Sequence, residues 1–444
     1  MRTFTGREIG GGLLSLIGLG ILASGVVRSP WVAGRIGGPG ALDRMDVLLG
    51  YSLWALGIGV VVFVLGSLFS RSPKHDGLVM LTLMLAGVIL ADRYVLASFG
   101  LPLWEHDPVL RYRHRPGVTR WIHPGDPSLG QYHINDYGQH DVAFPVTKPE
   151  GELRGLMIGD SVTMGYGVPH EATYATQLEK LLAAHDKTHA QHQAINTGVH
   201  GYSTFQERVV LEGALRFQPD FIVVGFCLND VTEPFIVDAE LGGTGVDYHA
   251  VQQTPSAALG WLLNETGVGR VIQTLQTRGK TLEAEKRHER YDVRAMALGS
   301  ETEPRFVEAW KFIEKDLERI YAIAKKEEKP LLVLVFPFTF QLLAEDALKT
   351  PQRIVLDHAK RHGVEAIDVL PEFESALFDD PELLAAMRTK YNDEAIRKFY
   401  EWKIREYFFD QDHFTAKGNA LVAKQIYGWL ADEGLVTKTS TASM

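Results

Sequence analysis

The sequence predicts an α/β protein in which a parallel sheet is covered by helices on both faces and preceded by transmembrane helices. Two observations carry this prediction. The first hundred residues hold three long apolar runs, and from residue 153 onward short apolar strands alternate with helical segments. Regular alternation of strand and helix is typical of a parallel sheet with crossover helices.

Residues 1–98 are predicted to form a membrane region with about three transmembrane helices. The runs 9–27 and 47–69 contain no charged residue, and a third run, 78–91, can extend past Asp92 and Arg93. A bilayer core of about 30 Å needs about 20 helical residues. A cleaved signal peptide would explain only the first run. Buried core helices are the other alternative, but the runs lack a polar face.

Residues 99–152 form a proline-rich connector. We expect an extended segment packed on the following domain, because proline restrains its own backbone and that of the preceding residue. The prolines of this stretch are Pro102, Pro108, Pro116, Pro124, Pro127, Pro145 and Pro149.

Residues 153–436 are predicted to form the α/β domain, followed by a disordered tail, 437–444. The expected strands are 153–158, 193–196, 220–226, 331–336 and 364–369. The expected helices are 172–185, 203–216, 305–326, 350–362 and 415–432, the last with Thr415 as a candidate cap. Two insertions, 231–304 and 371–409, adjoin strand ends and are candidates to wall or cover a site there.

Composition limits the function. The 444-residue chain has a formal net charge of −10, which argues against a nucleic-acid partner because such partners favour a basic face. The single cysteine, Cys227, excludes an internal disulfide. It lies in an apolar strand, where a small buried side chain is expected.

A serine follows the first predicted strand of the domain in a tight turn, Gly159-Asp160-Ser161. Gly159 would permit the bend, and Ser161 would lie at the carboxyl end of a strand, where ligands gather in open α/β sheets. A helix N-cap is the structural alternative for Ser161. Asp160 is expected to bind the backbone of the turn. Serine needs a base before it becomes a nucleophile, so the prediction depends on partners elsewhere in the chain.

Candidate partners occur downstream. The stretch Asp410-Gln411-Asp412-His413 lies just before the last predicted helix, so one short loop could present an imidazole and the carboxylate that orients it. Asp410 and Asp412 compete for that orienting role. Two polar turns, one with Gly201 and one with Asn229, follow the second and third predicted strands. Taken singly, each is also typical of an ordinary turn.

These four blocks resemble the SGNH (GDSL) hydrolase superfamily in order and approximate spacing, over about residues 130–235 and 305–432. The resemblance implies a flavodoxin-like three-layer α/β/α domain. It implies Ser161 as nucleophile, His413 as base and Asp410 as orienting acid, which leaves Asp412 as a solvated neighbour.

The resemblance also implies an oxyanion hole. Its donors would be the backbone N–H groups of Ser161 and Gly201 and the side-chain amide of Asn229. Such donors stabilise the negative charge that develops on the carbonyl oxygen during acyl transfer.

The stretch 132–138 is similar to a lead-in segment of membrane-attached members of the superfamily. The implied function is a membrane-anchored serine esterase or O-acyltransferase. It would act on acyl esters, acetyl included, of cell-surface carbohydrate or lipid through an acyl-serine intermediate. The partners would be the lipid bilayer and this substrate, with no cofactor. A catalytically silent subunit of a membrane complex and a lipase or phospholipase are the alternatives.

Orientation in the membrane depends on flanking charges. Arg2 and Arg7 precede the first run, and the two loops between the runs also carry basic residues, so the positive-inside rule is nearly balanced. The resemblance favours an N-terminus inside. With three spans, the catalytic domain of this multi-pass protein would then lie outside the cytoplasm, in the periplasm or at the cell surface.

One rival set of residues suggests a metal. His185, His189 and His192 have helix-face spacing, which could bind a metal ion. They lie, however, in a polar stretch at the end of a predicted helix, apart from the four blocks. We therefore expect no metal site.

Overall fold

The computed structural model describes residues 103–107, 109–122, 126–232, 293–342, 346–377 and 401–437. Nearer the N-terminus it describes helical pieces at 14–15, 17–21, 57, 59–66 and 68. Within this described part of the chain, no helix has both the length and the apolar character needed to cross a bilayer. Most of the three predicted spans lies outside it, as do residues 233–292 of the first insertion and 378–400 of the second.

The chain divides into two compact units. One comprises residues 1–103, 123–129 and 252–280, and the other comprises 104–122, 130–251 and 281–444. The second unit contains the α/β domain.

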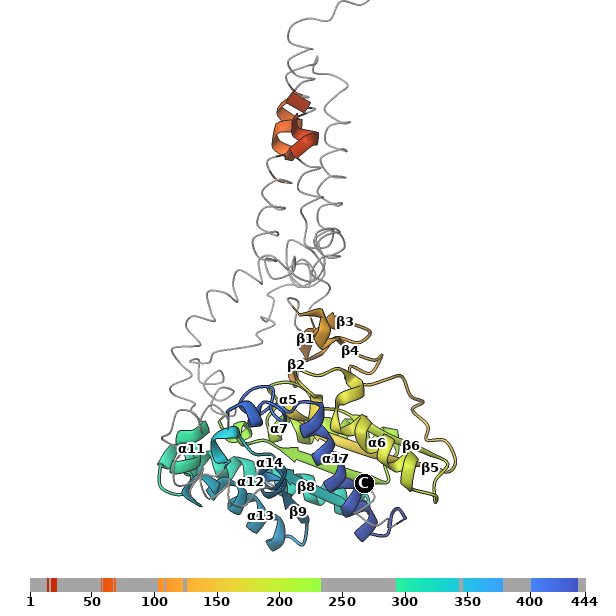
Figure 1. The fold of residues 1–444 in the computed structure, drawn as a ribbon, viewed down its shortest axis with the longest axis vertical. Coiled ribbons are helices and arrows are strands. Elements are labelled where there is room, and N and C mark those ends of the chain that lie inside the picture. Colours follow the sequence, from red (N-terminus) through yellow and green to blue (C-terminus); the bar gives the residue numbers. More distant parts are fainter. Residues whose placement is uncertain are drawn as a thin grey trace, which may run out of the picture. The chain divides into compact units, whose positions relative to one another are not determined.

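A five-stranded parallel sheet forms the centre of this domain in the described residues, with the strand order β6-β5-β7-β8-β9 (Figure 1). The five strands confirm the predicted ones to within two residues at each end: β5 (Glu152–Gly159), β6 (Gln191–Asn196), β7 (Phe221–Phe226), β8 (Leu331–Val335) and β9 (Glu365–Asp368). After β5 the chain forms β6 on one side of β5, and it then crosses to the other side of β5 to form β7. Ligands bind at such a switch point, outside the carboxyl ends of the strands.

The three inner strands are buried along their whole length, because helices cover both faces of the sheet. That is why β5, β7 and β8 are nearly continuous apolar runs instead of alternating patterns. The edge strands β6 and β9 begin with exposed residues.

Five long helices confirm the predicted ones: α6 (Tyr174–His185), α7 (Thr204–Ala214), α12 (Pro304–Lys326), α13 (Thr350–Arg361) and α17 (Ala416–Asp432). Helix α6 packs on α17, and α7 packs on α12 (Figure 1). Because crossovers between parallel strands are right-handed, α6 covers one face and α7, α12 and α13 cover the other. Thr415 caps α17, as predicted, by accepting a hydrogen bond from the Gly418 N–H.

The connector contains strand pairs that its proline content did not predict. Strand β1 (Trp104–Asp107) pairs antiparallel with β2 (Arg111–His114), and β3 (Thr119–Trp121) pairs antiparallel with β4 (Gln131–His133). Other short elements that were not predicted are α5 (Ser161–Met164), α11 (Val293–Gly299), α14 (Leu370–Leu377), and the 3-10 helices η2 (Pro127–Leu129), η3 (His170–Ala172), η4 (Leu215–Phe217), η5 (Leu228–Val231), η6 (Thr339–Gln341) and η7 (Asp346–Lys349).

Thr437, the first residue of the predicted tail, contacts the α/β domain. The Thr437 carbonyl accepts a hydrogen bond from Tyr427 Oη at 2.9 Å. The Thr437 hydroxyl lies 3.4 Å from Asp186 Oδ1. Thr437 therefore belongs to the packed domain, and residues 438–444 lie outside the described part.

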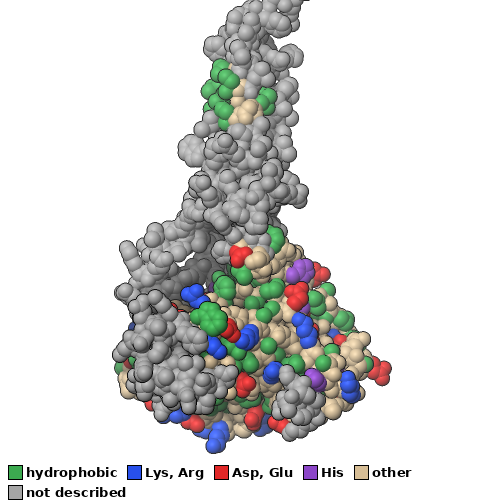
Figure 2. All heavy atoms as spheres, viewed as in Figure 1, with side chains coloured by type: hydrophobic (Ala, Val, Ile, Leu, Met, Phe, Trp, Pro, Cys, Tyr) green, Lys and Arg blue, Asp and Glu red, His purple; other side chains and the backbone are tan. Residues whose placement is uncertain are grey.

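Charged side chains of both signs are interspersed on the face of the domain seen in Figure 2. Exposed ion pairs link neighbouring helices and loops, for example Arg361 with Glu314 at 3.2 Å and Arg353 with Glu301 at 2.9 Å. Such exposed pairs contribute only about 0–1 kcal/mol each.

Candidate active site

The structure brings together the three residues predicted as a triad. His413 Nε2 lies 2.8 Å from Ser161 Oγ, although the two residues are 252 positions apart. His413 Nδ1 lies 2.7 Å from Asp410 Oδ2. Because an ionised carboxylate only accepts, Nδ1 carries the hydrogen and Nε2 can accept the serine proton. Both distances fall in the range expected for a nucleophile, its base and an orienting group.

The nucleophile turn is built by its neighbours. Ser161 is the first residue of α5, directly beyond β5, and Asp160 is the N-cap, whose side chain accepts from the Val162 N–H at 2.9 Å. The capping role considered for Ser161 thus belongs to Asp160, which binds the turn backbone as predicted. The Ser161 hydroxyl is left to face His413.

Two glycines allow this turn to pack tightly. Gly159 was expected to permit a bend, but its φ lies outside the left-handed region. Space is the reason instead, since a Cβ at Gly159 would lie 2.0 Å from Thr163 Oγ1. In the loop after β6, a Cβ at Gly198 would lie 2.2 Å from the Met164 N atom. Neither position accepts a side chain unless the turn moves.

The loop that carries His413 is held by its own carboxylate. Asp410 Oδ1 accepts from the backbone N–H of Asp412 at 3.2 Å and of His413 at 3.0 Å. Asp412 Oδ1 is 3.5 Å from His413 Nδ1, farther than either oxygen of Asp410. The geometry therefore favours Asp410 as the orienting acid.

Asp412 is not the solvated neighbour that was expected. Its side chain is 14% exposed, against 39% for Asp410. It lies against Cys227, with 4.0 Å between the Asp412 Oδ2 and Cys227 Sγ atoms. Cys227 is fully buried, as predicted, and burial raises the pKa of its thiol.

The charges of this loop tune the imidazole. Burial alone would lower the pKa of His413, but the carboxylates of Asp412 and Asp410 outweigh burial and raise that pKa above its ordinary value. Burial alone would raise the pKa of Asp410, but the contact with His413 outweighs it and lowers that pKa. Asp410 is therefore ionised and can stabilise the imidazolium that forms when His413 takes a proton.

The Asn229 amide lies beside the serine. Asn229 follows β7 within η5, and its Nδ2 donates to Asp160 Oδ2 at 3.1 Å. The Ser161 hydroxyl is 3.3 Å from the same oxygen. The Asn229 amide and the Ser161 hydroxyl therefore meet at one carboxylate oxygen of Asp160. Burial raises the pKa of the Asp160 carboxyl.

Gly201 lies in the loop between β6 and α7 with a φ of +75°. Its carbonyl accepts from Tyr112 Oη at 2.7 Å. The adjacent His200 ring is 6.3 Å from the His413 ring, between centroids, so this loop borders the site. The oxyanion roles of the Ser161 N–H, the Gly201 N–H and the Asn229 amide stay predictions.

An aromatic wall beside the triad was missed from the sequence. The Tyr166 ring is 4.5 Å from the His413 ring and stacks on His200 at 5.1 Å, between centroids. Phe409, at the end of the second insertion, lies 6.4 Å from Tyr166 and is 43% exposed. Two signals could have found this wall: Tyr166 follows Ser161 by five residues, and His200 adjoins Gly201.

Connector residues hold the loop that contains Gly201. Tyr112 Oη lies within hydrogen-bond distance of the carbonyls of Gly201 and His200, at 2.7 and 3.0 Å. In return, Tyr202 Oη donates to the Tyr112 carbonyl at 2.6 Å. Tyr132 Oη accepts from the Gly167 N–H at 2.9 Å, next to the aromatic wall. The connector is thus part of the support of the site.

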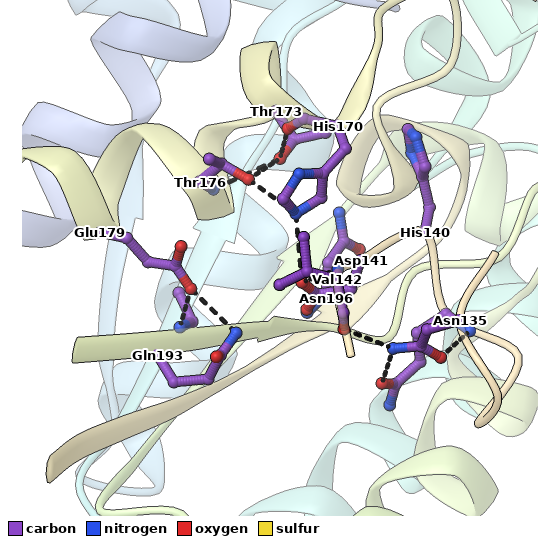
Figure 3. A network of polar contacts seen from close by, with 12 residues as sticks. Asn135, His140, Asp141, Val142, His170, Thr173, Thr176, Glu179, Gln193 and Asn196 are labelled. Carbon is purple, nitrogen blue, oxygen red and sulfur yellow. Dashed lines mark hydrogen bonds and ion pairs between the residues drawn. The ribbon is translucent and has the colours of Figure 1, made fainter. Parts of the chain in front are cut away.

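A second set of connector residues braces the ends of α5 and β6. His140 Nδ1 donates to the Met164 carbonyl at 2.8 Å, and burial lowers the pKa of His140 to about 4, so that the ring is neutral. Asp141 Oδ2 accepts from the Asn196 N–H at 3.0 Å, and its Oδ1 lies 3.1 Å from His170 Nε2 (Figure 3).

The three histidines considered for a metal do not share a helix face. His185 ends α6, with its ring 6.0 Å from that of Tyr427, whereas His192 belongs to β6. His189 Nδ1 and His192 Nε2 both hydrogen-bond to Asp186 Oδ2, at 2.8 and 2.9 Å. The buried Asp186 carboxylate, which the spacing of the histidines does not indicate, therefore organises this cluster.

Comparisons with solved structures give distant similarities. The chain is similar to an acetyl xylan esterase, AlAXEase, at 14% identity over 63% of this chain and 100% of that chain, with a TM-score of 0.34. A lipase/acylhydrolase from Enterococcus faecalis is similar at 11% identity, over 65% and 100%, with a TM-score of 0.33. A mutant of an acetylxylan esterase from Geobacillus stearothermophilus is similar at 14% identity, over 64% and 94%, with a TM-score of 0.33. No curated protein sequence matched the chain.

The family comparison covers most of the α/β domain. The model of the GDSL-like lipase/acylhydrolase family matches residues 157–421, which is more than half of the chain. The matched range contains all five residues predicted for the site, from Ser161 to His413. The chain belongs to the GDSL-like lipase/acylhydrolase family and is a serine hydrolase.

Proposed function

We propose that the protein is a membrane-anchored esterase or O-acyltransferase that carries its acyl group on Ser161. The observation that carries this proposal is the hydrogen-bonded series from Ser161 Oγ to His413 Nε2, at 2.8 Å, and from His413 Nδ1 to Asp410, at 2.7 Å. A serine held in this way can be deprotonated as it attacks a carbonyl carbon.

In the first step, Ser161 Oγ forms a bond to the ester carbonyl carbon while its proton passes to His413 Nε2. Asp410 keeps the Nδ1–H hydrogen bond and stabilises the imidazolium. The carbonyl π electrons move to oxygen, and the Ser161 N–H, Gly201 N–H and Asn229 amide would donate to that oxyanion. Each such donor is worth about 2.7–4 kcal/mol of barrier.

In the second step, the bond between the carbonyl carbon and the alkoxy oxygen breaks, and His413 gives its proton to the departing alcohol. The acyl group stays on Ser161. Water or another hydroxyl then attacks the acyl carbon with His413 as base, and Ser161 Oγ recovers the proton as it leaves. Hydrolysis and transfer use the same residues, and the acceptor decides between them.

Burial and the aromatic wall support a small acyl group. Ser161 is 2% exposed and His413 is 7% exposed, so a bulky group has little access to the nucleophile. The rings of Tyr166 and His200 beside His413 offer a flat carbon surface to the rest of the substrate. We infer an acetyl or similarly short acyl ester on a cell-surface carbohydrate or lipid.

Membrane attachment is supported by the three apolar runs and by helix contacts near the N-terminus. In the described pieces, Ser15 Oγ lies 3.4 Å from the Phe63 carbonyl, and a Cβ on Gly18 would lie 2.4 Å from the Phe63 N atom. Small residues at such close helix contacts are typical of membrane helices. The proposed topology has the N-terminus inside and the catalytic domain outside the cytoplasm, where surface esters are found.

The proposal is tested with a fluorophosphonate probe, which modifies activated serines. Wild type should be labelled and Ser161→Ala should not. Ser300→Ala is the matched control, because it removes another buried serine, whose hydroxyl donates to the Met296 carbonyl. His413→Ala should lose both turnover and labelling, and its circular dichroism spectrum should match that of wild type. Undiminished labelling of Ser161→Ala would remove Ser161 from the nucleophile role.

Two further measurements test the finer parts of the proposal. Turnover of acetyl esters should exceed that of long-chain esters, and the reverse preference would favour a lipase or phospholipase. The protein should stay with the membrane fraction after alkaline carbonate washing, and protease added outside intact cells should cut the catalytic domain. Release by carbonate or full protection from that protease would contradict the proposed attachment or topology.

A further inference from the structure

Helices α12 and α13 bring three ligand-type side chains together on the side of the domain formed by these two helices. Glu318 lies on α12, His358 on α13, and His362 one turn later at the end of α13. Glu318 Oε1 is 3.8 Å from His358 Nε2 and 3.7 Å from His362 Nε2. One ligand atom from each of the three residues lies within 4.8 Å of the other two.

The histidines present their Nε2 atoms to this common point. His362 Nδ1 is 2.9 Å from the His358 carbonyl, which can only accept, so the hydrogen of the neutral ring is on Nδ1 and Nε2 has the lone pair. His358 Nδ1 lies 3.4 Å from Tyr321 Oη. Such a hydrogen bond on the far nitrogen is how proteins fix the ring orientation of a metal-binding histidine.

His358 is the most buried of the three candidate ligand residues, and the surroundings of its Nε2 atom indicate a metal ligand. The His358 side chain is 2% exposed, and its Nε2 is buried without a hydrogen-bond partner among the described residues. The Glu318 Oε1 atom, 3.8 Å from His358 Nε2, is beyond hydrogen-bond distance. A buried polar atom of this kind costs about 1–3 kcal/mol unless something binds it.

We propose that Glu318, His358 and His362 bind one divalent transition-metal ion of the zinc type, which joins α12 to α13. A tetrahedral zinc ion with bonds of about 2.0–2.1 Å keeps its ligand atoms about 3.3–3.5 Å apart. The two separations from Glu318 Oε1 to the imidazole nitrogens, 3.7 and 3.8 Å, need to close by a few tenths of an ångström, and the ligand atoms of His358 and His362 lie within 4.8 Å of each other. Glu318 is 54% exposed and His362 is 36% exposed, so both can move and the ion can enter from solvent.

In two other histidine–carboxylate clusters of the described residues, the imidazole nitrogens are already hydrogen-bonded. At Asp186, both imidazole nitrogens are 2.8–2.9 Å from one oxygen, so hydrogen atoms occupy the space an ion would need. At Asp410, the imidazole is hydrogen-bonded on both sides, to the carboxylate and to Ser161. The trio on α12 and α13 has separations too long for hydrogen bonds and short enough for a shared ion.

The test measures metal content and thermal stability of the full-length protein. After treatment with EDTA, wild type dialysed against Zn²⁺ and then against metal-free buffer should retain about one ion per chain. Zn²⁺ at a hundredfold excess over its Kd should raise Tm by about 5 °C. Co²⁺ should give the visible absorption of a tetrahedral N/O site.

His362→Ala and Glu318→Ala, which alter exposed residues, should lose the retained zinc, the Tm shift and the cobalt spectrum. His358→Ala should do the same, but it empties a buried position, so the other two variants decide the outcome. Glu314→Gln, which breaks the neighbouring ion pair with Arg361, and His189→Ala, at the Asp186 cluster, are the matched controls and should behave as wild type. The proposal is overturned if wild type retains no zinc, or if His362→Ala and Glu318→Ala retain it fully.

Discussion

Two histidine–carboxylate clusters of this protein share their local geometry but lie at opposite ends of the sheet. The imidazole–carboxylate distances are 2.7 Å at Asp410 and 2.8–2.9 Å at Asp186. The Asp186 cluster lies around the start of β6, whereas His413 faces the turn that follows β5. What distinguishes them is the third partner. A serine hydroxyl meets His413, whereas a second imidazole shares the Asp186 oxygen.

The carboxylates of Asp186 and Asp410 also stabilise different parts of the fold. Asp186 Oδ1 accepts from the Thr188 N–H at 2.9 Å, so it builds the turn between α6 and β6. Burial alone would raise the pKa of Asp186, but hydrogen bonds from His192, Thr188 and His189 outweigh burial and lower that pKa. A lowered carboxylate pKa beside histidine is therefore no mark of catalysis in itself. Position at the carboxyl end of a strand, next to an activated hydroxyl, is what separates the two clusters.

The largest effect that would test this contrast is expected for Asp410→Asn. Losing the charge that holds His413 in the correct tautomer should lower kcat by about 10³–10⁴-fold. Asp186→Asn is the matched variant and should leave kcat within about twofold, a change of less than about 0.5 kcal/mol in barrier. Equal losses of kcat in Asp410→Asn and Asp186→Asn, measured with a short acetyl ester, would contradict a catalytic role specific to Asp410.

Asn229→Ala should lower kcat by about 10²–10³-fold with little change in KM, because an oxyanion donor acts mainly in the transition state. Gln352→Ala, which removes a buried amide of α13 bonded to Gln341, is its control. Unchanged kcat in Asn229→Ala would exclude the amide from the oxyanion hole and assign it to holding Asp160.

Asp186→Ala is expected to affect stability instead of turnover. It removes the acceptor of His189, His192 and Thr188 and should lower the free energy of unfolding by about 1–3 kcal/mol at pH 7. Because the folded-state pKa of Asp186 is lowered, its contribution is complete above the unfolded value of about 4 and declines as the pH falls below it. The difference from wild type in urea unfolding should therefore shrink below about pH 4. A difference that grows on acidification would contradict this assignment.

The smallest effect is expected for Asp412→Asn. The active form of His413 is neutral, and its pKa is raised, so activity should rise with pH along a limb that lies above about 6.5. Removing the Asp412 charge should move this limb of kcat/KM to lower pH, with the plateau retained. A limb that stays in place would show that Asp410 alone sets the pKa of the imidazole.

The sheet could be predicted from the sequence because its signals are local. Inner parallel strands such as β5 and β7 are buried on both faces and are therefore continuous apolar runs. The start of a helix such as α17 can be predicted from its N-cap residue, here Thr415. The four blocks were recognisable because each is a short turn at a fixed place relative to a strand or helix.

The support of the site could not be predicted in the same way. Tyr112 contacts Gly201 across 89 positions, and nothing in the connector's prolines indicates that pairing. Asp412 looked solvated because its burial against Cys227 depends on a contact across 185 positions. The spacing of His358 and His362 on a predicted helix was visible, but their third ligand comes from another helix. Long-range packing decides such features.

The paired tyrosines Tyr112 and Tyr202 have a practical consequence for producing the catalytic domain alone. A recombinant version trimmed to the family boundary near residue 157 would discard Tyr112, His140 and Asp141 together. The loops around Ser161 and Gly201 would lose their outer hydrogen-bond partners, and the Tyr202 hydroxyl would lose its acceptor. A recombinant catalytic domain should therefore begin at or before Leu103, so that it includes the hairpin of β1 and β2.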